Sequence, residues 1–411
     1  MSVFPSEHLA AAYVIFLASY LVFALGRFPG TKIDRTAAAI IGAALMFAFR
    51  VVNPSAAMRS IDYTTLVLLF SMMLIAASLH ACGFFEWVAA TFVEHVPARH
   101  LLPSVIFTSG ILSAFLVNDI VCLLMAPLVL QICREFSRKP TPYLLALATA
   151  SNIGSAASIT GNPQNILIGS LSGLSYADFL IHLAPVAIIG LFLAWLVLHL
   201  LYFRGSTQEK PTPSNTSESI RVSKSQLLFP VAVTLTVLLG FFAGMPPALV
   251  AAIGAAILLM YPKFHPREIY QEVDWPLLVF FTGLFLIVGG VEEAGIAQHL
   301  LALAEKLNLQ NHWIFSGVTL LLSNTVSNVP AVMLLKGLAP QYGNGHFFWL
   351  LLSMASTLAG NLTITGSVAN IIVVEKARAE SPISFTEYLR AGVPITLLTM
   401  VVGVLWLKMV G

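Results

Sequence analysis

The stretch SNIGSAASITGNPQNILIGS, residues 151–170, places Asn, Ser, Gly, Pro and Gln in the middle of an otherwise apolar run, which begins with LLALATA. The chain of 411 residues is 58% hydrophobic and 10% charged, whereas soluble globular proteins carry about 25% charged residues. Successive apolar runs of roughly 20 residues are each long enough to cross a bilayer core of about 30 Å. The composition therefore indicates a polytopic, all-α membrane protein in which this stretch interrupts a span.

Apolar runs predict ten spans, at 9–27, 36–52, 64–82, 142–171, 177–203, 227–244, 247–262, 275–291, 347–374 and 386–408. Two further apolar stretches, 101–133 and 313–340, are too long for one crossing, and polar residues interrupt each near its middle. We interpret both as re-entrant helical hairpins that return to the side they entered. A segment rich in Ser, Thr, Pro and charge, 205–225, is interpreted as a cytoplasmic linker.

The two halves of the chain resemble one another. IDYTTLVLLF (61–70) matches VDWPLLVFF (273–281), and TGNPQNILI (160–168) matches TGSVANIIV (365–373). Agreement at a nearly constant offset indicates an internal duplication, with units at 1–204 and 226–411. Because a hairpin does not change sides, each unit has an odd number of crossings and the second is inverted. We expect two inverted repeats of about five transmembrane helices, each with a hairpin (101–133, 313–340) and a broken helix (142–171, 347–374).

The distribution of positive charge predicts the orientation. With the hairpins counted as re-entrant, most Lys and Arg residues fall on one side of the membrane. The other side receives only Arg50, Arg59, Lys306, Lys336 and Lys408. By the positive-inside rule the first side is cytoplasmic, so both termini are expected outside the inner (plasma) membrane.

Four polar islands are the candidate site: FLVNDIV (115–121), ASNIGSAASITGNPQN (150–165), LLSNTVSNVP (321–330) and LAGNLTITGSVAN (358–370). Unpaired backbone in hydrocarbon is costly, so helices break only where the break is buried or lines a cavity. Inverted-repeat transporters use such breaks to hold substrate and coupling ions. Small polar residues also allow helices to pack closely, but four islands in duplicated positions favour a binding site.

The islands supply amide and hydroxyl oxygens and close backbone approach, which suit ion and oxyanion binding. The predicted substrate- or ion-binding residues are Asn118, Asp119, Ser151, Asn152, Gly154, Ser155, Thr160, Gly161, Asn162, Asn165, Ser323, Asn324, Thr325, Ser327, Asn328, Gly360, Asn361, Thr363, Thr365, Gly366, Ser367 and Asn370.

Asp119 is the only carboxylate deep in a predicted hairpin, where a charged group is costly and usually functional. We predict that it carries the coupling proton or coordinates a cation. A role as the cap of the second hairpin helix is the alternative, and both roles are compatible. Asp62 and Asp274, at span starts, are expected to cap helices. The histidines show no metal-ligand spacing, so no metal site is expected. The sequence has no phosphate-binding loop, so an enzyme is not expected either. The only expected cofactor is a coupling ion, H⁺ or Na⁺.

At the islands the sequence resembles the ion transporter superfamily, which includes arsenite/antimonite permeases, sodium/proton antiporters, citrate transporters and divalent-anion/sodium symporters. The run from Gly161 to Asn165 is similar to that family's Gly-Thr/Asp-Pro-Pro-Asn segment, and Ser323-Asn324-Thr325 is similar to a symporter signature. Asn118-Asp119, the following APLVL (126–130) and HACGFFEWVA (80–89) look most like arsenical pump membrane proteins. The resemblance implies a scaffold, a transport domain that moves as an elevator, and Na⁺ sites near Asn118 and Asn324.

The leading functional hypothesis is a secondary active transporter of a small inorganic oxyanion or metalloid, with proton-coupled arsenite/antimonite efflux as the first choice. The absence of Lys and Arg from the four islands favours a neutral hydroxide such as arsenous acid, or an ion that is neutralised by co-bound cations. The alternatives are a sodium- or proton-coupled symporter of citrate-like or dicarboxylate anions, a sodium/proton antiporter and a passive channel. The expected partners are the substrate, membrane lipid and a second copy in a homodimer, with no nucleic acid.

Overall fold

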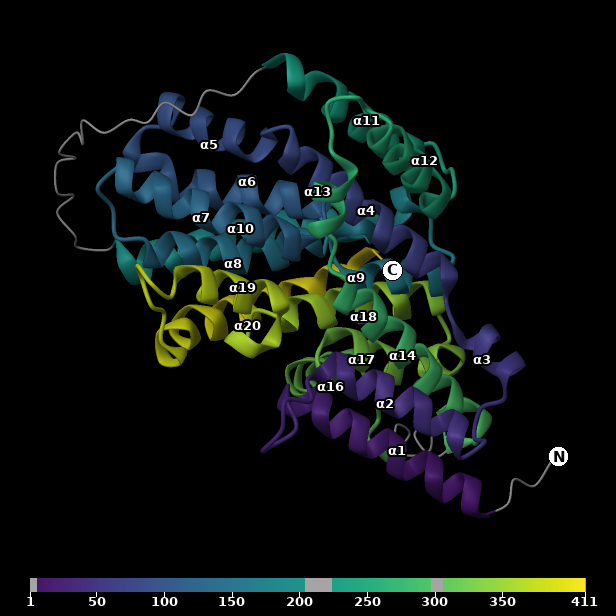
Figure 1. Ribbon diagram of the computed structural model, residues 1–411. Helices are drawn as coiled ribbons and strands as arrows, with labels where there is room; N and C mark the ends of the chain where they lie inside the picture. Colours follow the sequence, from purple (N-terminus) through teal and green to yellow (C-terminus); the bar gives the residue numbers. More distant parts are fainter. Residues whose placement is uncertain (1–5, 204–223, 297–305, 411) are drawn as a thin grey trace.

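The computed structural model describes residues 6–203, 224–296 and 306–410, and within these ranges the regular elements are helices (Figure 1). The first half contains α1 (Ser6–Leu25), α2 (Arg35–Ala48), α3 (Pro54–Ser60), α4 (Tyr63–Ala81), α5 (Phe84–His95), η1 (Ala98–His100), α6 (Leu101–Phe115), α7 (Asn118–Glu135), α8 (Thr141–Ser155), η2 (Ile159–Gly161), α9 (Pro163–Ser172) and α10 (Tyr176–Tyr202). The short helices α3 and α5 between the spans were not predicted.

The second half repeats this order. It contains α11 (Lys224–Phe242), α12 (Pro247–Leu259), α13 (Pro266–Gln271), α14 (Trp275–Glu293), α16 (His312–Val326), α17 (Asn328–Leu335), η3 (Lys336–Gln341), α18 (Gly345–Ala359), η4 (Ile364–Gly366), α19 (Val368–Ala377) and α20 (Phe385–Val410). The linker predicted at 205–225 lies outside the described residues except at its end, because α11 begins at Lys224. The boundary between the repeats therefore stays a prediction.

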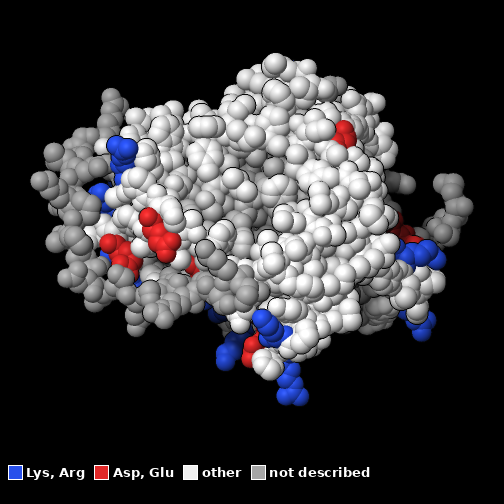
Figure 2. All heavy atoms as spheres, turned by 90° about the horizontal axis from the view of Figure 1, so that it is seen from above, with Lys and Arg blue, Asp and Glu red and all other residues white. Residues whose placement is uncertain are grey.

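The described helices suit a membrane. Five of them are long and apolar enough to cross a hydrocarbon core: α1, α4, α10, α14 and α20. In Figure 2 the charged side chains lie toward the edges of the face shown, and a broad uncharged expanse separates them. An uncharged band of this kind is what contact with lipid tails requires.

Both predicted hairpins are present. In the first, α6 ends at Phe115, Leu116 and Val117 are not helical, and α7 begins at Asn118. In the second, α16 ends at Val326 and Ser327 takes a positive φ of 78°, so that α17 starts again at Asn328. The turn in each hairpin therefore directly precedes an asparagine at a helix N-terminus.

The two spans predicted to be broken are interrupted at matching places. After α8 the chain is extended at Ser158, forms the short η2, and is extended again at Asn162. The Asn162 side chain caps α9 by accepting the backbone N–H of Asn165 at 2.8 Å. Pro163 follows as the first helical residue, where its missing N–H costs no hydrogen bond. In the second half η4 and Ser367 take the same places before α19.

The hydrogen bonds at the two breaks repeat at the same offset as the sequence. Asn165 donates through Nδ2 to the carbonyl oxygens of Ser155 and Ser158, both at 3.0 Å. Asn370, 205 residues later, donates to the carbonyl oxygens at the equivalent positions 360 and 363, at 2.7 and 3.0 Å. The chain therefore consists of two inverted repeats, each with a hairpin and a broken helix, as the sequence predicted.

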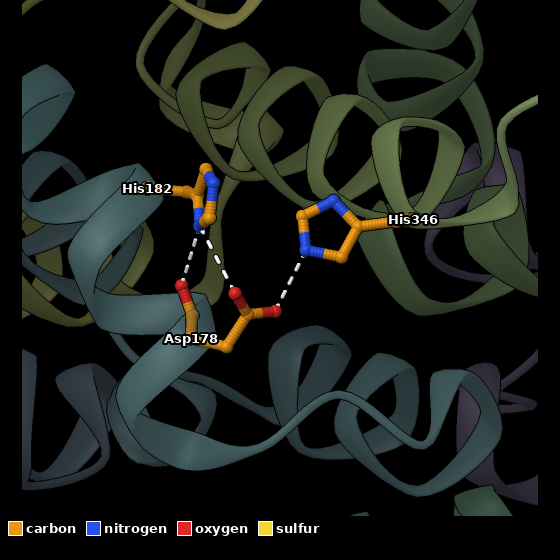
Figure 3. A group of neighbouring side chains, drawn as sticks. All are labelled: Asp178, His182 and His346. Carbon is orange, nitrogen blue, oxygen red and sulfur yellow. Dashed lines mark hydrogen bonds and ion pairs between the residues drawn. The ribbon is translucent and has the colours of Figure 1, made fainter. Parts of the chain in front are cut away.

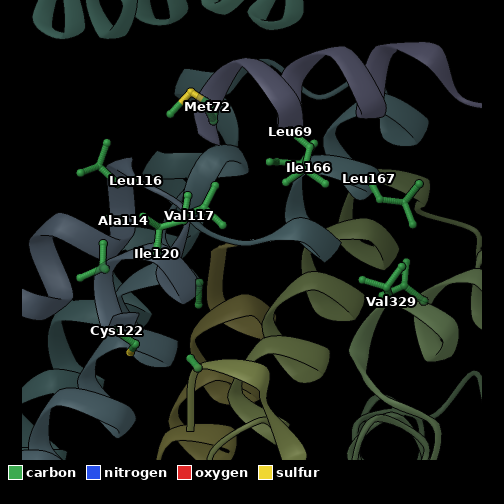
Figure 4. Close-up of a cluster of buried hydrophobic side chains, with 14 of the residues drawn as sticks. Leu69, Met72, Ala114, Leu116, Val117, Ile120, Cys122, Ile166, Leu167 and Val329 are labelled. Atoms are coloured by element: carbon green, nitrogen blue, oxygen red, sulfur yellow. The ribbon is translucent and has the colours of Figure 1, made fainter. Parts of the chain in front are cut away.

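The helices form a central stack, with a smaller group of helices on each side of it. Hairpins, broken helices and the last span of each repeat pack together: α6 on α8, α7 on α19, α16 on α18, and α10 on α20. In Figure 1 α6–α10 and α18–α20 form a stack, with α4, α11 and α12 on one side and α1, α2 and α14 on the other. An apolar cluster lies at the first hairpin tip and extends to α9 (Figure 4), where Leu69 of α4 lies next to Ile166 and Val329 lies below Leu167. This packing keeps lipid and water away from one side of the breaks.

Candidate functional site

Four half-helix N-termini meet at one cavity of about 180 Å³. They are the starts of α7, α9, α17 and α19, one from each polar island. Residues at the start of α2 and in the first two turns of α14 complete the lining. The lining residues are Arg35, Thr36, Asn118, Asp119, Pro163, Gln164, Asp274, Pro276, Leu277, Phe280, Ser327, Asn328, Val329, Ser367 and Val368. Such starts carry unpaired backbone N–H groups and a partial positive charge, so together they attract oxygen atoms of a ligand.

A chain of amides leads from one break to the cavity and fixes the direction of each group. Asn361 donates to the backbone carbonyl of Thr149 at 3.1 Å, so its Oδ1 is free to accept. Asn152 then donates through Nδ2 to Asn361 Oδ1 and to Asn370 Oδ1, both at 2.9 Å. Asn118 Nδ2 in turn donates to Asn152 Oδ1 at 3.0 Å. The Oδ1 atom of Asn118 is consequently left as a free acceptor.

The same network joins the two broken helices symmetrically. In one direction Asn152 of α8 donates to Asn370 of α19, and in the other Thr357 of α18 donates to Asn165 of α9, at 3.2 Å. Ser367 also donates to Asn152 at 2.9 Å. The two breaks are therefore held together by side chains that are themselves buried. This fixes the positions of the N-termini that line the cavity.

Two oxygens at the hairpin tips lack partners. Asn118 Oδ1 and Asn328 Oδ1 are buried and accept no hydrogen bond from the described residues. Both asparagines line the cavity and occupy equivalent positions in the two repeats. A buried acceptor without a partner costs about 1–3 kcal/mol, so these oxygens are suited to accept from a bound molecule.

Asp119, in the first turn of α7, lies at the N-terminus of α19, a half-helix of the other repeat. Its carboxylate lies close enough to the backbone N–H of Ala369, in the first turn of α19, to interact with it electrostatically. The carboxylate of Asp274, from α14, also interacts with it electrostatically. Asp274 caps α14 by accepting the backbone N–H of Leu277 at 3.0 Å, as expected, but it also lines the cavity. The sequence predicted the capping role of Asp274 but not its position on the cavity wall.

Arg35 is the one cationic side chain among the lining residues. Its Nε donates to the backbone carbonyl of Phe23 at 2.9 Å, which satisfies the C-terminal end of α1. The guanidinium is thus partly committed to the protein. Arg35 lies in α2, far in sequence from the islands, so the absence of cations from the islands did not predict it.

The predicted residues fall into groups by position. Asn118, Asp119, Ser327, Asn328 and Ser367 line the cavity. The members of the supporting network behind it are Ser151, Asn152, Ser155, Asn162, Asn165, Asn324, Asn361, Thr363, Thr365 and Asn370. Asn324 donates to the Leu320 and Ala359 carbonyls and accepts from Thr363, so it has little capacity left for an ion.

Other predicted residues have roles in packing. An added Cβ at Gly154 would lie 2.0 Å from the carbonyl oxygen of Gly110, so this glycine allows α8 to approach α6. Gly161 and Gly366 are crowded as well, since an added Cβ would lie 2.1 Å from the Ser155 carbonyl oxygen and 2.6 Å from Asn324 Oδ1, respectively. At Gly360 the nearest atom would be 3.1 Å away, so this position is less tightly packed. Thr160 pairs with Tyr176 at 2.9 Å. Thr325 is exposed and donates to Leu321 in its own helix, and Ser323 is buried without a described partner.

Sequence reasoning missed several lining residues. Pro163, Gln164, Val329 and Val368 lie in or next to the islands, at helix starts, and that position was a usable signal. Arg35, Thr36, Asp274, Pro276, Leu277 and Phe280 reach the cavity through the packing of α2 and α14, which no local pattern showed.

The chain is similar to known proteins over nearly its whole length. The family described as citrate transporter matches residues 20–355. A 46 kDa membrane protein of Mycobacterium leprae is 32% identical over 97% of this chain and 98% of its own. A transporter designated arsB of Dictyostelium discoideum is 28% identical (97% and 92%), and the silicon efflux transporter LSI3 of Oryza sativa subsp. japonica is 29% identical (92% and 93%).

A solved structure has the same fold. The YdaH transporter of Alcanivorax borkumensis aligns with a TM-score of 0.65 at 13% identity, covering 98% of this chain and 99% of that one. A helical membrane protein whose inverted halves bring four half-helix N-termini to one cavity is a secondary transporter rather than an enzyme. This chain belongs to the citrate transporter family.

Proposed function

We propose that this transporter exports a small metalloid hydroxide, with arsenite or antimonite as the first choice, in exchange for protons. The observation that carries the proposal is the pairing of free acceptors with helix N-termini in one small cavity. Asn118 Oδ1 and Asn328 Oδ1 require hydrogen-bond donors from a ligand. The helix starts offer N–H groups to its lone pairs. A molecule such as arsenous acid, whose every oxygen both donates and accepts, satisfies both.

The charges around the cavity leave only a small positive excess, which disfavours a multiply charged anion. A helix N-terminus is equivalent to roughly +0.5 elementary charge, so four amount to about +2. The carboxylates of Asp119 and Asp274 offset that amount when both are ionised. Arg35 adds a positive charge at the cavity wall, where it also binds the end of α1. The sum is about +1, which suits a neutral or singly charged ligand better than a multiply charged anion.

The size of the cavity and two relatives support the same class of ligand. The volume of about 180 Å³ is below the roughly 300–1,000 Å³ of pockets for drug-sized ligands. The relatives designated arsB and silicon efflux transporter, each aligned over more than 90% of this chain, carry names that refer to metalloids.

A citrate-like carboxylate is the second candidate. The family description supports it, and helix N-termini bind carboxylates without cationic side chains. It requires that a proton or Na⁺ first neutralise one of the two cavity carboxylates, so it predicts uptake that depends on the coupling ion. A sodium/proton antiporter is less favoured. In that case the free oxygens of Asn118 and Asn328 would bind only a cation, and the N–H groups at the helix starts would have no ligand.

Asp119 is proposed as the proton carrier. When ionised, its carboxylate is an acceptor on the cavity wall that can bind an O–H group of a metalloid hydroxide. Protonation removes the negative charge and occupies an acceptor position of the carboxylate. Proton and substrate therefore compete for the same carboxylate, which is the condition for exchange of one against the other.

Alternating access is proposed to follow an elevator motion. The cavity meets α2 and α14 only at their first two turns, from Arg35 and Asp274 to Phe280. In the orientation predicted from the charges, those helices begin on the cytoplasmic side and both termini lie outside, so this conformation faces inward. By the inverted repeat, the outward state brings the hairpin tips to the start of α4, the counterpart of α14.

Cysteine cross-linking tests this motion in a background without Cys82, Cys122 and Cys133. Val329→Cys is expected to cross-link with Leu277→Cys, since both residues line the present cavity. It is expected to cross-link with Thr64→Cys, at the start of α4, in the opposite state. Active protein that forms only the first pair under all gradients would contradict the elevator.

The test of function is arsenite transport. Expression is expected to restore growth of a metalloid-sensitive strain on arsenite and antimonite. Everted vesicles are expected to accumulate arsenite when a pH gradient is imposed, with citrate and succinate tested in parallel. Sodium-dependent citrate uptake without arsenite accumulation would support the second candidate instead.

A further inference from the structure

Asp178, His182 and His346 form a cluster that has no part in the cavity (Figure 3). Asp178 and His182 lie near the start of α10, and His346 is the second residue of α18. The Asp178 carboxylate bridges the imidazoles, with Oδ2 at 2.7 Å from His346 Nε2 and Oδ1 at 3.3 Å from His182 Nδ1. The side chains of Asp178, His182 and His346 are 34%, 20% and 36% exposed, so ions in water can reach them.

The cluster is held in place by three helices. His182 Nδ1 lies 2.8 Å from the backbone carbonyl of Asp178, which orients the ring. The backbone carbonyl of His182 accepts the indole N–H of Trp406, in α20, at 2.9 Å. The two imidazole rings lie edge to face with their centroids 4.9 Å apart. Metal sites depend on this kind of orientation of their ligands by surrounding groups.

The duplicated fold does not require these histidines. In the inverted repeat the positions equivalent to Asp178, His182 and His346 hold Glu387, Ala391 and Thr141. That corner is held instead by a hydrogen bond of 3.0 Å between the hydroxyls of Thr141 and Ser381. The two histidines and the aspartate therefore occur at only one of two structurally equivalent corners. Other residues provide the packing at the second corner, so packing alone does not require histidine.

We propose that Asp178, His182 and His346 bind one divalent transition-metal ion, with Zn²⁺ as the preferred ion. Each residue offers a ligand atom, and these atoms lie within 4.8 Å of one another. Two imidazoles and a carboxylate suit Zn²⁺, whereas Mg²⁺ and Ca²⁺ prefer oxygen ligands. Three protein ligands leave the fourth tetrahedral position to water. The ion would replace the hydrogen bond between His346 and Asp178. It would bind His182 either through Nε2 or through Nδ1, and in the second case Nδ1 would give up the proton that it now donates to the Asp178 backbone carbonyl.

Such an ion would join the starts of α10 and α18. The α18 helix carries Ser353 and Thr357, which donate to Asn165 behind the cavity at 2.8 and 3.2 Å. Zinc is therefore expected to stabilise the bundle that holds the half-helix N-termini. This role does not depend on which solute the cavity binds.

Thermal unfolding of the tag-free, detergent-purified full chain, with ZnCl₂ or MgCl₂ added, tests the proposal. Zinc is expected to raise the melting temperature of the wild type by several degrees in a saturable manner, and magnesium is expected to have no effect. Elemental analysis after desalting is expected to find one zinc per chain. His346→Ala is expected to lose both effects. His312→Ala, at the start of α16 and outside the cluster, is expected to keep them.

His346→Gln separates ligand loss from misfolding. Its amide still donates a hydrogen bond to Asp178, so the variant is expected to fold and to unfold near the wild-type temperature without zinc, yet to show no zinc shift. The proposal is overturned if the wild type shows no shift. It is also overturned if His346→Gln and His312→Ala retain the same shift and the same zinc content.

Discussion

Asn152 of the first broken helix donates a hydrogen bond of 2.9 Å to Asn361 of the second, 209 residues away in the sequence. The two amides connect the interrupted segments of oppositely oriented repeats. Asn361 is fixed in turn by the carbonyl of Thr149, and Asn118 at the hairpin tip is fixed by Asn152. The direction of every amide up to the cavity thus follows from one backbone carbonyl.

Replacing Asn152 with Ala is expected to lower both stability and transport. The change leaves the buried oxygens of Asn361 and Asn370 without their donor and Asn118 without its acceptor. Hydrogen bonds between membrane helices average about 0.6 kcal/mol, but unpaired buried groups cost about 1–3 kcal/mol. A loss of roughly 2 kcal/mol in unfolding free energy is expected, measured by chemical denaturation in detergent. Thr325→Ala, which removes one exposed bond within α16, is the control and is expected to change little.

Gly154→Ala is expected to prevent correct packing. The added Cβ would lie 2.0 Å from the carbonyl oxygen of Gly110, a backbone atom that has no rotamer to change. Overpacking of this kind costs at least 1–3 kcal/mol. We expect little monodisperse protein on size-exclusion chromatography. Gly317→Ala in α16, where a Cβ meets no atom within 4 Å, is expected to behave as wild type. Normal folding of the Gly154 variant would return this glycine to the list of candidate ligand contacts.

The sequence predicted the features that depend on local pattern and duplication. Asn165 and Asn370 were paired by alignment of the repeats, and the structure gives them the same hydrogen bonds. The hairpins followed from apolar stretches with polar middles. Gly154 was interpreted as a ligand contact, because a glycine that admits a neighbouring helix and one that admits a ligand have the same signature in a single sequence.

Features that depend on the packing of distant helices were out of reach. Arg35 and Asp274 meet the cavity only because α2 and α14 stand against the hairpin tips. His182 and His346 lie in different helices, so their spacing along the chain gives no metal-ligand pattern. In each case the residue type was visible, but the partner was set by tertiary structure.

Asp274 and its counterpart Asp62 form a natural matched pair. Each caps a helix through the backbone N–H three residues on, at 3.0 Å for Asp274 and 3.1 Å for Asp62, but only Asp274 lines the cavity. Asn is also a good cap, so Asp→Asn at either site is expected to change stability by less than about 1 kcal/mol. Asp274→Asn is expected to alter the Michaelis constant for arsenite in everted vesicles, which present arsenite to the cavity of the conformation described here. Asp62→Asn is expected to leave that constant unchanged, because the proposed motion brings the start of α4 to the hairpin tips only in the outward state. If the two variants have the same Michaelis constant for arsenite, the carboxylate of Asp274 has no influence on substrate binding.

Asn328→Ala is expected to weaken ligand binding with little loss of stability. Its Oδ1 has no partner among the described residues, so its removal frees no buried donor. A single hydrogen bond to a ligand is worth about 0.5–1.5 kcal/mol, which corresponds to an increase of roughly two- to tenfold in Kd. Isothermal titration with arsenite measures this change. Ser316→Ala, which removes another buried hydroxyl without a described partner but outside the cavity lining, is the control. An unchanged Kd for Asn328→Ala would exclude this tip from the binding site.

Asp119→Asn is expected to separate binding from proton coupling. An amide at this position cannot take up and release a proton, but its oxygen still lines the cavity and can accept a hydrogen bond from a ligand. The variant should therefore still bind arsenite and exchange it across a vesicle membrane at equal concentrations. It should lose accumulation driven by a pH gradient, and its exchange rate should no longer depend on pH. Asp34→Asn, which alters an exposed cap of α2 outside the cavity lining, controls for a general effect of the charge change. If Asp119→Asn accumulates arsenite at the wild-type level, another group carries the proton. Asp274 would be tested next, because it is the other carboxylate on the cavity wall.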